Sequence, residues 1–477
     1  MLVVRDLDRD RRTGTCDPVD LLHDPDRVRE VLDHVDRHDL VDGIVAEGPW
    51  KPTEVADQID TGEADPVDVH VTRTDIAPAS EVQSPGSHEP APRIEGREPA
   101  RQYIIATSVA RGPGPPHLED DAMRVAIFYD YLQTIGGGER VALTLAQHLD
   151  ADLITTEPDP GLPERAGFPG VRVVTLGRIL LQPPLKQIHA SWRFARAGFN
   201  GYDFSFLIGN WAHYAGRRHH PNVYYCLTPT RAFYDQRSAM LARLPAPNRW
   251  VARTWSTVHG HLERRSVGRC DRIVAISRTV RERVRRYYGR ESNVIYPPVA
   301  TRRHRFKELG DFWLSVSRMY PEKRIELQLD IFRRLPGEKL VLVGGYSAGD
   351  RAERYLASLN PPENVTLLGE ISEDRLVDLY ARCRGFITTA VDEDFGITPV
   401  EAMAAGKCVL ATNEGGYRET VVDGMTGFLL PADANAFATK LRELDDSRLS
   451  AMRDTCVARA REFDEAVFVS KMRAFLE

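Results

Sequence analysis

The chain has 477 residues, enough for two or three domains, and its 42% hydrophobic content is typical of a soluble globular protein. No run of about 18 apolar residues occurs, and the N-terminal MLVVRDLDRD lacks an apolar core, so we expect neither a membrane span nor a signal peptide. The six cysteines are scattered without a C-x-x-C pair, which argues against a disulfide framework or zinc site and favours a cytoplasmic location.

The net charge of −6 conceals three regions of different charge. Residues 1–122 carry a net charge of −14, residues 123–306 carry +15 and residues 307–477 carry −7. A strongly basic region between two acidic ones predicts an anionic partner for that middle region.

The acidic region 1–122 differs in composition from the rest of the chain. Within it, residues 24–40 have the apolar spacing of a helix, whereas Pro, Gly, Ser and acidic residues dominate from about 61 to 120. We interpret the region as an N-terminal extension and linker, partly disordered. The Asp-x-Asp spacing in DLDRD follows no convincing strand, so we expect no metal site there.

Residues 123–306 alternate between strand and helix patterns. RVAIFYD (124–130) predicts a strand, YLQTIGGGER (131–140) a glycine-rich turn, and VALTLAQHL (141–149) a helix. This succession indicates a Rossmann-like α/β domain, although the turn is not the G-x-G-x-x-G of dinucleotide sites. Further strands of a parallel sheet are predicted at 152–156, 204–209, 223–228, 272–277 and 293–297.

Residues 307–477 repeat this alternation and predict a second Rossmann-like domain. FWLSVSRMYPEKRIELQLDIF (312–332) indicates a strand, a loop and a helix. We expect the last helix, 464–477, to pack back on the first domain. Further strands are predicted at 339–345, 364–369, 385–390 and 407–412.

An acid-rich loop and a short helix at residues 391–405 hold the strongest functional signal. Seven residues separate Glu393, in the loop, from Glu401, in the helix. A loop that runs into a helix N-terminus presents unpaired N–H donors, which suit an anionic or hydroxyl-rich ligand. Two carboxylates there can accept hydrogen bonds from sugar hydroxyls, although Glu401 could also be an ordinary acid of the first helical turn.

The stretch EDFGITPVEAMAAG, with the following GGYRE and DGMTGFL, resembles the E-x7-E region of family 4 retaining glycosyltransferases. The resemblance implies the GT-B fold, in which two Rossmann-like domains face each other across a cleft. YYCLTPTR (224–231), CDRIVAISR (270–278) and RRYYGRESNVIYPPV (285–299) are similar to the mannosyltransferase-like branch that builds cell-surface glycans.

The resemblance also implies a set of site residues. Glu393 would meet the hydroxyls of the donor sugar, Glu401 the ribose, and Ile371 the base. Gly137 and Gly138 would bring the backbone of the first domain close to the diphosphate. The remaining donor-binding candidates are Phe395, Gly396 and Ile397 in the loop, and Gly345 after a predicted strand.

Arg318 and Lys323 lie in a piece, SRMYPEKR, that resembles the family's G-R-x-x-x-x-K stretch. Arg can hold a diphosphate by a two-pronged fork and Lys as a point charge, each bond contributing about 1.5–3 kcal/mol. The family often has a histidine where this chain has Leu227, which is a departure from its pattern. At another family position, a histidine shortly after the preceding strand, His213 in GNWAHYAG is the candidate catalytic histidine by resemblance, although a small shift in alignment would place Trp211 there.

The resemblance implies a hexosyltransferase that uses a nucleotide-diphosphate sugar and retains anomeric configuration, and we expect it to be metal-independent. We expect GDP-mannose or a UDP-sugar as the donor substrate, no other cofactor, and a glycan or polyprenyl-phosphate-linked acceptor. The Asp392–Glu393–Asp394 run is interpreted as sugar-contacting, so that Arg318, Lys323 and loop N–H groups replace a metal ion.

Two other classes of protein remain open, a nucleotide-sugar epimerase or hydrolase of the same fold and a non-catalytic nucleotide-sugar-binding subunit. Basic residues in 249–290 and the mixed apolar and basic segment 179–194 predict an anionic membrane surface as a partner, and no nucleic acid is expected. The expected location is cytoplasmic, peripheral on the inner face of the cell membrane.

Overall fold

The computed structural model describes residues 123–476 except 157, 160, 180–183, 243, 346–354 and 356–357, and it also describes three strands nearer the N-terminus. The chain divides into two compact units, Met1–Asp120 and Asp121–Glu477. The helix predicted within 24–40 lies outside the described residues.

The three described strands of the first unit form one antiparallel sheet in the order β1-β3-β2. Two of them fall in the range 61–120 that the composition assigned to linker, so the linker prediction does not extend to these strands. Both contain β-branched residues, in VHVTR and QYIIAT, which favour extended backbone. The strands are β1 (Ile44–Glu47), β2 (Val69–Arg73) and β3 (Gln102–Thr107).

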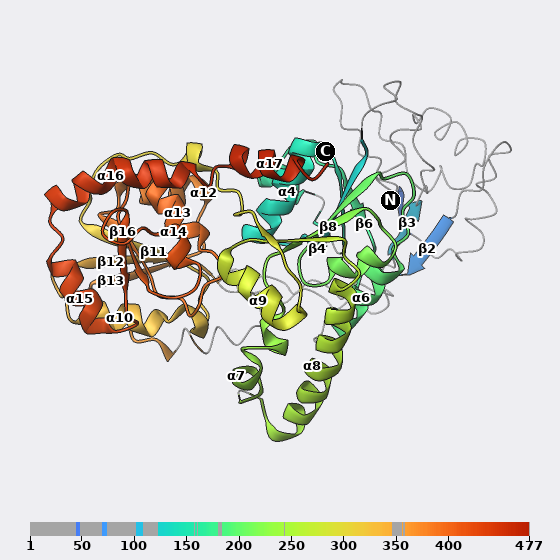
Figure 1. The fold of residues 1–477 in the computed structure, drawn as a ribbon, viewed down its shortest axis with the longest axis horizontal. Coiled ribbons are helices and arrows are strands. Elements are labelled where there is room, and N and C mark those ends of the chain that lie inside the picture. The colour runs from blue at the N-terminus through green and yellow to red at the C-terminus, as the bar shows by residue number, and fades with distance from the viewer. Residues whose placement is uncertain are drawn as a thin grey trace, which may run out of the picture. The chain divides into compact units, whose positions relative to one another are not determined.

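The second unit begins with a seven-stranded parallel sheet in the order β10-β9-β8-β7-β4-β5-β6 (Figure 1). Six strands lie at positions that the sequence predicts. The three-residue β6 was not predicted. The strands are β4 (Val125–Tyr131), β5 (Asp152–Thr156), β6 (Val173–Thr175), β7 (Phe204–Ile208), β8 (Asn222–Cys226), β9 (Arg272–Ala275) and β10 (Asn293–Val294).

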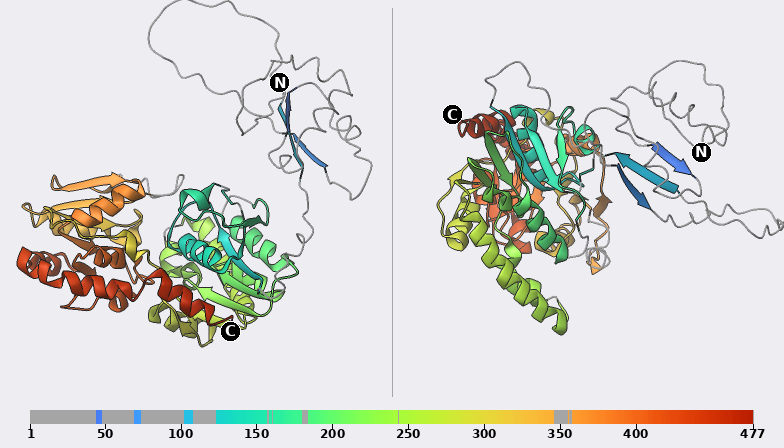
Figure 2. Two further views of the ribbon diagram at one scale, coloured as in Figure 1. Left: turned by 90° about the horizontal axis from the view of Figure 1, so that it is seen from above. Right: turned by 90° about the vertical axis from the view of Figure 1, so that its right-hand side faces the viewer.

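Helices surround this sheet, and one of them extends beyond it. α8 projects away from the sheet together with α7, as Figure 1 and the right-hand view of Figure 2 show. The helices of this first Rossmann-like domain are α4 (Gly137–Leu149), α5 (Leu162–Arg165), α6 (Leu185–Arg196), α7 (Arg237–Ala242), α8 (Ala246–Val267) and α9 (Arg278–Tyr288).

A second parallel sheet follows, with six strands in the order β13-β12-β11-β14-β15-β16. Five of these strands were predicted, and β16 was not. On the neighbouring strands β11 and β14, Trp313 pairs with Gly385 and Leu314 pairs with Phe386, and both Trp313 and Phe386 are fully buried. The strands are β11 (Phe312–Val316), β12 (Lys339–Val343), β13 (Val365–Gly369), β14 (Gly385–Thr388), β15 (Val409–Thr412) and β16 (Gly427–Leu430).

The helices of the second Rossmann-like domain lie on both faces of its sheet. α10 packs against α15 on one face, and α13 packs against α16 on the other (Figure 1). These helices are α10 (Ile325–Arg333), α12 (Glu373–Arg382), α13 (Ile397–Ala404), α14 (Tyr417–Thr420), α15 (Ala434–Arg442) and α16 (Asp446–Arg461).

The last helix, α17 (Glu465–Arg473), returns to the first Rossmann-like domain and packs against α4 (Figure 1). The ring of Phe468 meets the ring of Tyr225 edge-on at 5.6 Å, and Arg473 donates a hydrogen bond to the carbonyl oxygen of His148. The chain therefore joins its two Rossmann-like domains at its C-terminal end as well as through the segment after β10.

Candidate functional site

A cleft of about 710 Å³ lies between the two Rossmann-like domains. The first domain lines it with the glycine-rich turn before α4, and the second domain lines it with the loops after β11 and β14. Nine of the twelve predicted site residues line this one cleft: Gly137, Gly138, Arg318, Lys323, Glu393, Phe395, Gly396, Ile397 and Glu401.

Glu393 lies in the loop between β14 and α13, with its side chain beside Lys323. The Lys323 Nζ atom donates to Glu393 Oε2 at 2.6 Å, and both side chains are partly exposed. The N–H of Gly416 holds the loop by donating to the Glu393 carbonyl at 2.7 Å. A Cβ at Gly415 would lie 2.3 Å from the same carbonyl oxygen, so the Gly-Gly turn is needed for this close packing.

Glu401 faces the cleft from inside α13. Tyr380 donates its hydroxyl to Glu401 Oε2 at 2.8 Å, which fixes the carboxylate from the neighbouring helix α12. The helix begins after Gly396, whose φ of +91° is rare for residues other than glycine, and a Cβ there would meet the Tyr417 ring at 2.8 Å. The N-terminus of α13 is therefore open to the cleft, where Gly396 and Ile397 are among its lining residues.

The glycine-rich turn of the first domain touches the same helix. A Cβ at Gly137 would lie 2.7 Å from Cδ1 of Ile397, and a Cβ at Gly138 would lie 2.7 Å from the Tyr129 hydroxyl. Only glycine permits this approach without displacing a neighbouring side chain. The turn thus brings the backbone of the first domain to the N-terminus of α13.

Arg318 lies in the loop after β11, at the carboxyl edge of the second sheet, where ligands bind in open α/β sheets. Gly344 packs against this loop, since a Cβ there would lie 1.9 Å from the Ser317 carbonyl oxygen. Gly344 lines the cleft, whereas the predicted Gly345 does not and packs against Glu370 instead. Ile371, predicted to meet the base, is also absent from the cleft lining.

His213 lies away from the cleft, fully buried in the first domain. Its Nδ1 is 2.9 Å from Ser266 Oγ on α8, and its ring stacks on Tyr214 at 4.6 Å. Burial lowers the pKa of His213 to about 3, so the imidazole is neutral. Trp211, the other candidate for this role, is also buried and outside the cleft lining.

Arg140 and Glu373 are cleft residues that the sequence analysis did not name. They form an ion pair across the two domains, and Arg303 contacts the same carboxylate at 2.8 Å. Burial lowers the pKa of Arg140, which is near Glu401. The position of Arg140, directly after Glu139 in the glycine-rich turn, could have indicated it, but nothing in the sequence pairs it with Glu373.

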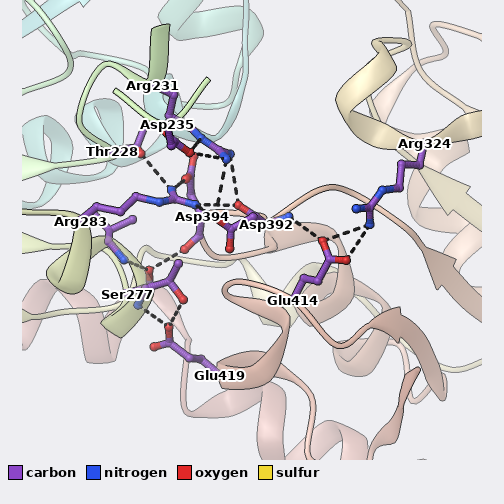
Figure 3. A network of polar contacts seen from close by, with 12 residues as sticks. Thr228, Arg231, Asp235, Ser277, Arg283, Arg324, Asp392, Asp394, Glu414 and Glu419 are labelled. Carbon is purple, nitrogen blue, oxygen red and sulfur yellow. Dashed lines mark hydrogen bonds and ion pairs between the residues drawn. The ribbon is translucent and has the colours of Figure 1, made fainter. Parts of the chain in front are cut away.

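The side chains of Asp392, Glu393 and Asp394 point in two different directions. Glu393 turns to Lys323, whereas Asp392 and Asp394 turn to Arg283 of the first domain (Figure 3). Asp394 still lines the cleft and Asp392 does not. Within the described part of the chain, no group of three His, Cys, Asp or Glu side chains is placed to hold a metal ion.

Two domains built on parallel sheets, with charged loops converging on the cleft between them, define a GT-B glycosyltransferase. A model described as "Glycosyltransferase Family 4" matches residues 135–303, and one described as "Glycosyl transferases group 1" matches residues 300–463. The chain belongs to the family 4 glycosyltransferases.

Known proteins with related sequences include mannosyltransferases. The chain is 34% identical to alpha-1,3/1,6-mannosyltransferase ALG2 of Dictyostelium discoideum, over 28% of this chain and 37% of that protein. It is 32% identical to the GDP-Man:Man(3)GlcNAc(2)-PP-Dol alpha-1,2-mannosyltransferase of the same organism, over 34% of this chain and 38% of that protein. The matches thus span less than half the length of either relative.

Among solved structures, HepE from Anabaena in complex with UDP and glucose has the same fold. The TM-score is 0.59 with 18% sequence identity, over 74% of this chain and 99% of that chain.

Proposed function

We propose that the protein is a retaining hexosyltransferase that moves a sugar from a nucleotide-diphosphate donor to a glycan or lipid-linked acceptor. The observation that carries this proposal is the convergence of Arg318, Lys323, Glu393 and Glu401 on one cleft, beside the open N-terminus of α13. Two cations and a set of N–H donors suit a diphosphate, and two carboxylates suit sugar hydroxyls.

The chemistry requires stabilisation of a departing diphosphate while the anomeric carbon becomes oxocarbenium-like. Arg318 and Lys323 supply positive charge where negative charge develops on the leaving group. Lys323 also contacts Glu393, so the same ammonium group orients the carboxylate that meets the sugar. Attack of the acceptor on the face that the diphosphate leaves retains the anomeric configuration without a protein nucleophile or a metal ion.

GDP-mannose is the first donor to test, and UDP-sugars are the second. One relative is named for GDP-mannose and an acceptor on dolichyl diphosphate, whereas the structural neighbour holds UDP and glucose. The first of these names supports a lipid-linked acceptor.

The test begins with nucleoside diphosphates and ends with turnover. GDP or UDP at about 100 times its Kd should add roughly 2.7 kcal/mol to the free energy of unfolding, measured as a rise in Tm. The corresponding nucleotide sugars are then incubated with and without a polyprenyl-phosphate-linked glycan. Acceptor-dependent release of nucleoside diphosphate supports the proposal.

The other outcomes identify the alternatives. Donor consumption that does not depend on the acceptor indicates an epimerase or hydrolase. Binding of nucleoside diphosphate without any turnover of the nucleotide sugar indicates a non-catalytic subunit. If neither nucleoside diphosphate raises Tm, the proposal is wrong.

A membrane surface on α6 and α8 is the second part of the proposal. Trp250 on α8 is 71% exposed, and large apolar side chains are also exposed at Val258 on α8 and Trp192 on α6. The two helices meet where Ser191 Oγ lies 3.1 Å from His259 Nε2. Apolar side chains seat in the headgroup region, and each nearby arginine contributes about 1 kcal/mol at an anionic leaflet.

Fewer of the arginines in 249–290 lie on this surface than the sequence predicted. Arg253, Arg264 and Arg265 are exposed on α8, but Arg283, inside the basic stretch 249–290, is buried at the domain interface. In the described part of the chain, no helix combines the length and apolar character needed to cross a bilayer.

Co-sedimentation with phosphatidylserine-containing vesicles tests the membrane surface. Trp250→Ser combined with Val258→Ser should abolish the binding seen at low salt, and high salt should weaken binding of the unchanged protein. Met425→Ser is the matched control, because Met425 is 57% exposed on the second domain. Equal loss in the control, or no binding at low salt, would contradict this part of the proposal.

A further inference from the structure

Arg283 on α9 is buried at the interface between the two Rossmann-like domains, with 7% of its side chain exposed. Its Nη2 donates to the Asp392 carbonyl at 2.8 Å and to Asp392 Oδ2 at 2.7 Å. Its Nη1 bonds to Asp394 Oδ1 and, at 3.2 Å, to Thr228 Oγ1 of its own domain. One guanidinium therefore holds both neighbours of Glu393 (Figure 3).

The loop that Arg283 holds needs outside support. Asp392 has a φ of +48°, a backbone conformation that is uncommon for residues other than glycine. Its carbonyl also accepts from Arg231 at 3.2 Å, and its N–H donates to Glu414 at 3.2 Å. Burial raises the pKa of Asp394, and the nearby Arg283 offsets part of that rise by stabilising the carboxylate.

The beginning of α9 is attached to the second domain as well. Glu419 accepts hydrogen bonds from the backbone N–H groups of Arg278 at 2.7 Å and Thr279 at 2.8 Å. Ser277, the residue before the helix, donates its hydroxyl to the Asp394 carbonyl at 2.5 Å. A carboxylate at a helix N-terminus is favourable, so these contacts stabilise α9 against the loop that carries Glu393.

We propose that Arg283 is a positioning residue, which fixes the Glu393 carboxylate in the cleft by holding Asp392 and Asp394 from the opposite domain. This inference rests on the proposed function, in which Glu393 meets the donor sugar. Glu393 is then held on one side by Lys323 of its own domain and, through its neighbours, by Arg283 of the other. The reacting geometry depends on the two domains being in contact.

The consequence is a selective effect on turnover. Without Arg283, the partly buried Asp394 loses its main cation. The loop from 392 to 394 loses three hydrogen bonds, one to the Asp392 carbonyl and two to the carboxylates of Asp392 and Asp394. Arg318 and Glu401 do not contact Arg283, so donor binding should change little. A displacement of about 1 Å in a catalytic group can lower the rate by roughly a hundredfold.

Three single variants of the full chain test the proposal. Arg283→Gln should lower kcat for donor turnover by roughly ten- to a hundredfold, with KM within about threefold. Arg283→Lys should recover part of the loss, since an ammonium can reach one carboxylate but lacks the fork that holds both. Arg285→Gln, exposed on the same helix, should leave kcat unchanged.

A double-mutant cycle distinguishes an effect of Arg283 on kcat that acts through Asp394 from an effect that is independent of Asp394. If Arg283 acts through Asp394, combining Arg283→Gln with Asp394→Asn should lower kcat no further than the more severe single variant. Losses that multiply would overturn the proposal, as would an Arg283→Gln variant with kcat within threefold of wild type. A retained rise in Tm with GDP or UDP shows that the variant is folded.

The two proposals fail in different ways. If wild type turns over no nucleotide sugar, the proposed function is wrong. The role of Arg283 is then read from hydrogen exchange of the amides of residues 392–396. Faster exchange in Arg283→Gln than in Arg285→Gln supports the positioning role, and equal exchange overturns it.

Discussion

The two Rossmann-like domains contribute to the cleft in different ways. The second domain lines it with charged side chains, of which Glu393 is paired within that domain with Lys323, and Glu401 with Tyr380. The first domain contributes mainly backbone, through its glycine-rich turn, together with Arg140. Under the proposed function, the groups that contact the donor therefore belong mainly to the second domain, and the first domain supplies backbone and anchoring contacts.

Two buried acids of the first domain hold loops of that same domain. The Asp130 carboxylate accepts three backbone N–H groups, from Asn210 at 2.6 Å, Trp211 at 2.8 Å and Ala212 at 2.7 Å. Burial raises the pKa of Asp130 to about 7 in spite of these bonds. Glu263, which is fully buried, accepts from Thr230 at 2.6 Å. These two acids hold loops, whereas Glu393 and Glu401 of the second domain line the cleft.

The largest effect that follows from this comparison is on turnover. Glu393→Gln should lower kcat by roughly a hundredfold or more, on the order of 3 kcal/mol, because the amide carries no charge to oppose the oxocarbenium-like centre. Donor binding, followed as a rise in Tm with nucleoside diphosphate, should persist. Glu443→Gln, at an exposed Lys440 pair on the same domain, is the control. Activity within a few-fold of wild type would contradict the assignment of Glu393 as the residue that contacts the donor sugar.

A second effect should appear in phosphate recognition. Lys323→Ala and Arg318→Ala should each weaken binding of GDP or UDP by about 1.5–3 kcal/mol while affecting the free nucleoside much less, because only phosphate contacts are removed. Isothermal titration of diphosphate and nucleoside measures the difference, with Lys440→Ala as the control. Equal weakening of both ligands would place these residues away from the diphosphate.

The third prediction concerns His213, a buried residue of the first Rossmann-like domain. If it is a structural residue, His213→Asn should lower the free energy of unfolding by about 1–3 kcal/mol and leave kcat within a few-fold of wild type. A large loss of kcat without loss of stability would restore the catalytic role that the sequence suggested.

The same residue should affect acid stability. Burial lowers the pKa of His213 from an ordinary 6.5 to about 3 in the folded protein, so between these pH values the unfolded chain takes up a proton that the folded protein does not. Stability from this group is present above pH 6.5 and is lost as pH falls toward 3. Denaturant unfolding from pH 7 to pH 4 should show a shallower decline for His213→Asn.

The smallest effect is expected from removing the first unit. Deleting Met1–Asp120 should leave a folded protein with unchanged nucleoside diphosphate binding, because the second unit, Asp121–Glu477, contains both parallel sheets and the cleft. Soluble expression and Tm with GDP or UDP measure this. Loss of soluble protein would show that the first unit is needed for folding.

The sequence by itself determined the α/β class, most strands of both sheets and the loop that carries Glu393. Apolar runs bounded by glycine and polar residues are local signals, and the E-x7-E region is one continuous stretch, so neither depends on distant contacts. β6 and β16 were not predicted, although β9, β10, β14 and β15 are no longer than β16 and were predicted, so strand length alone does not explain the omission.

Tertiary structure decided which polar and charged residues face the cleft and which are buried elsewhere. His213 lies in the segment GNWAHYAG and Arg283 in a basic stretch, and both are buried, His213 against Ser266 and Arg283 against Asp392 and Asp394. Residues more than 100 positions apart make the Arg283 contacts, and only the packing of α9 against the second domain brings them together. The burial and pairing of such residues depend on tertiary packing. Residue type and spacing in the sequence do not reveal that packing.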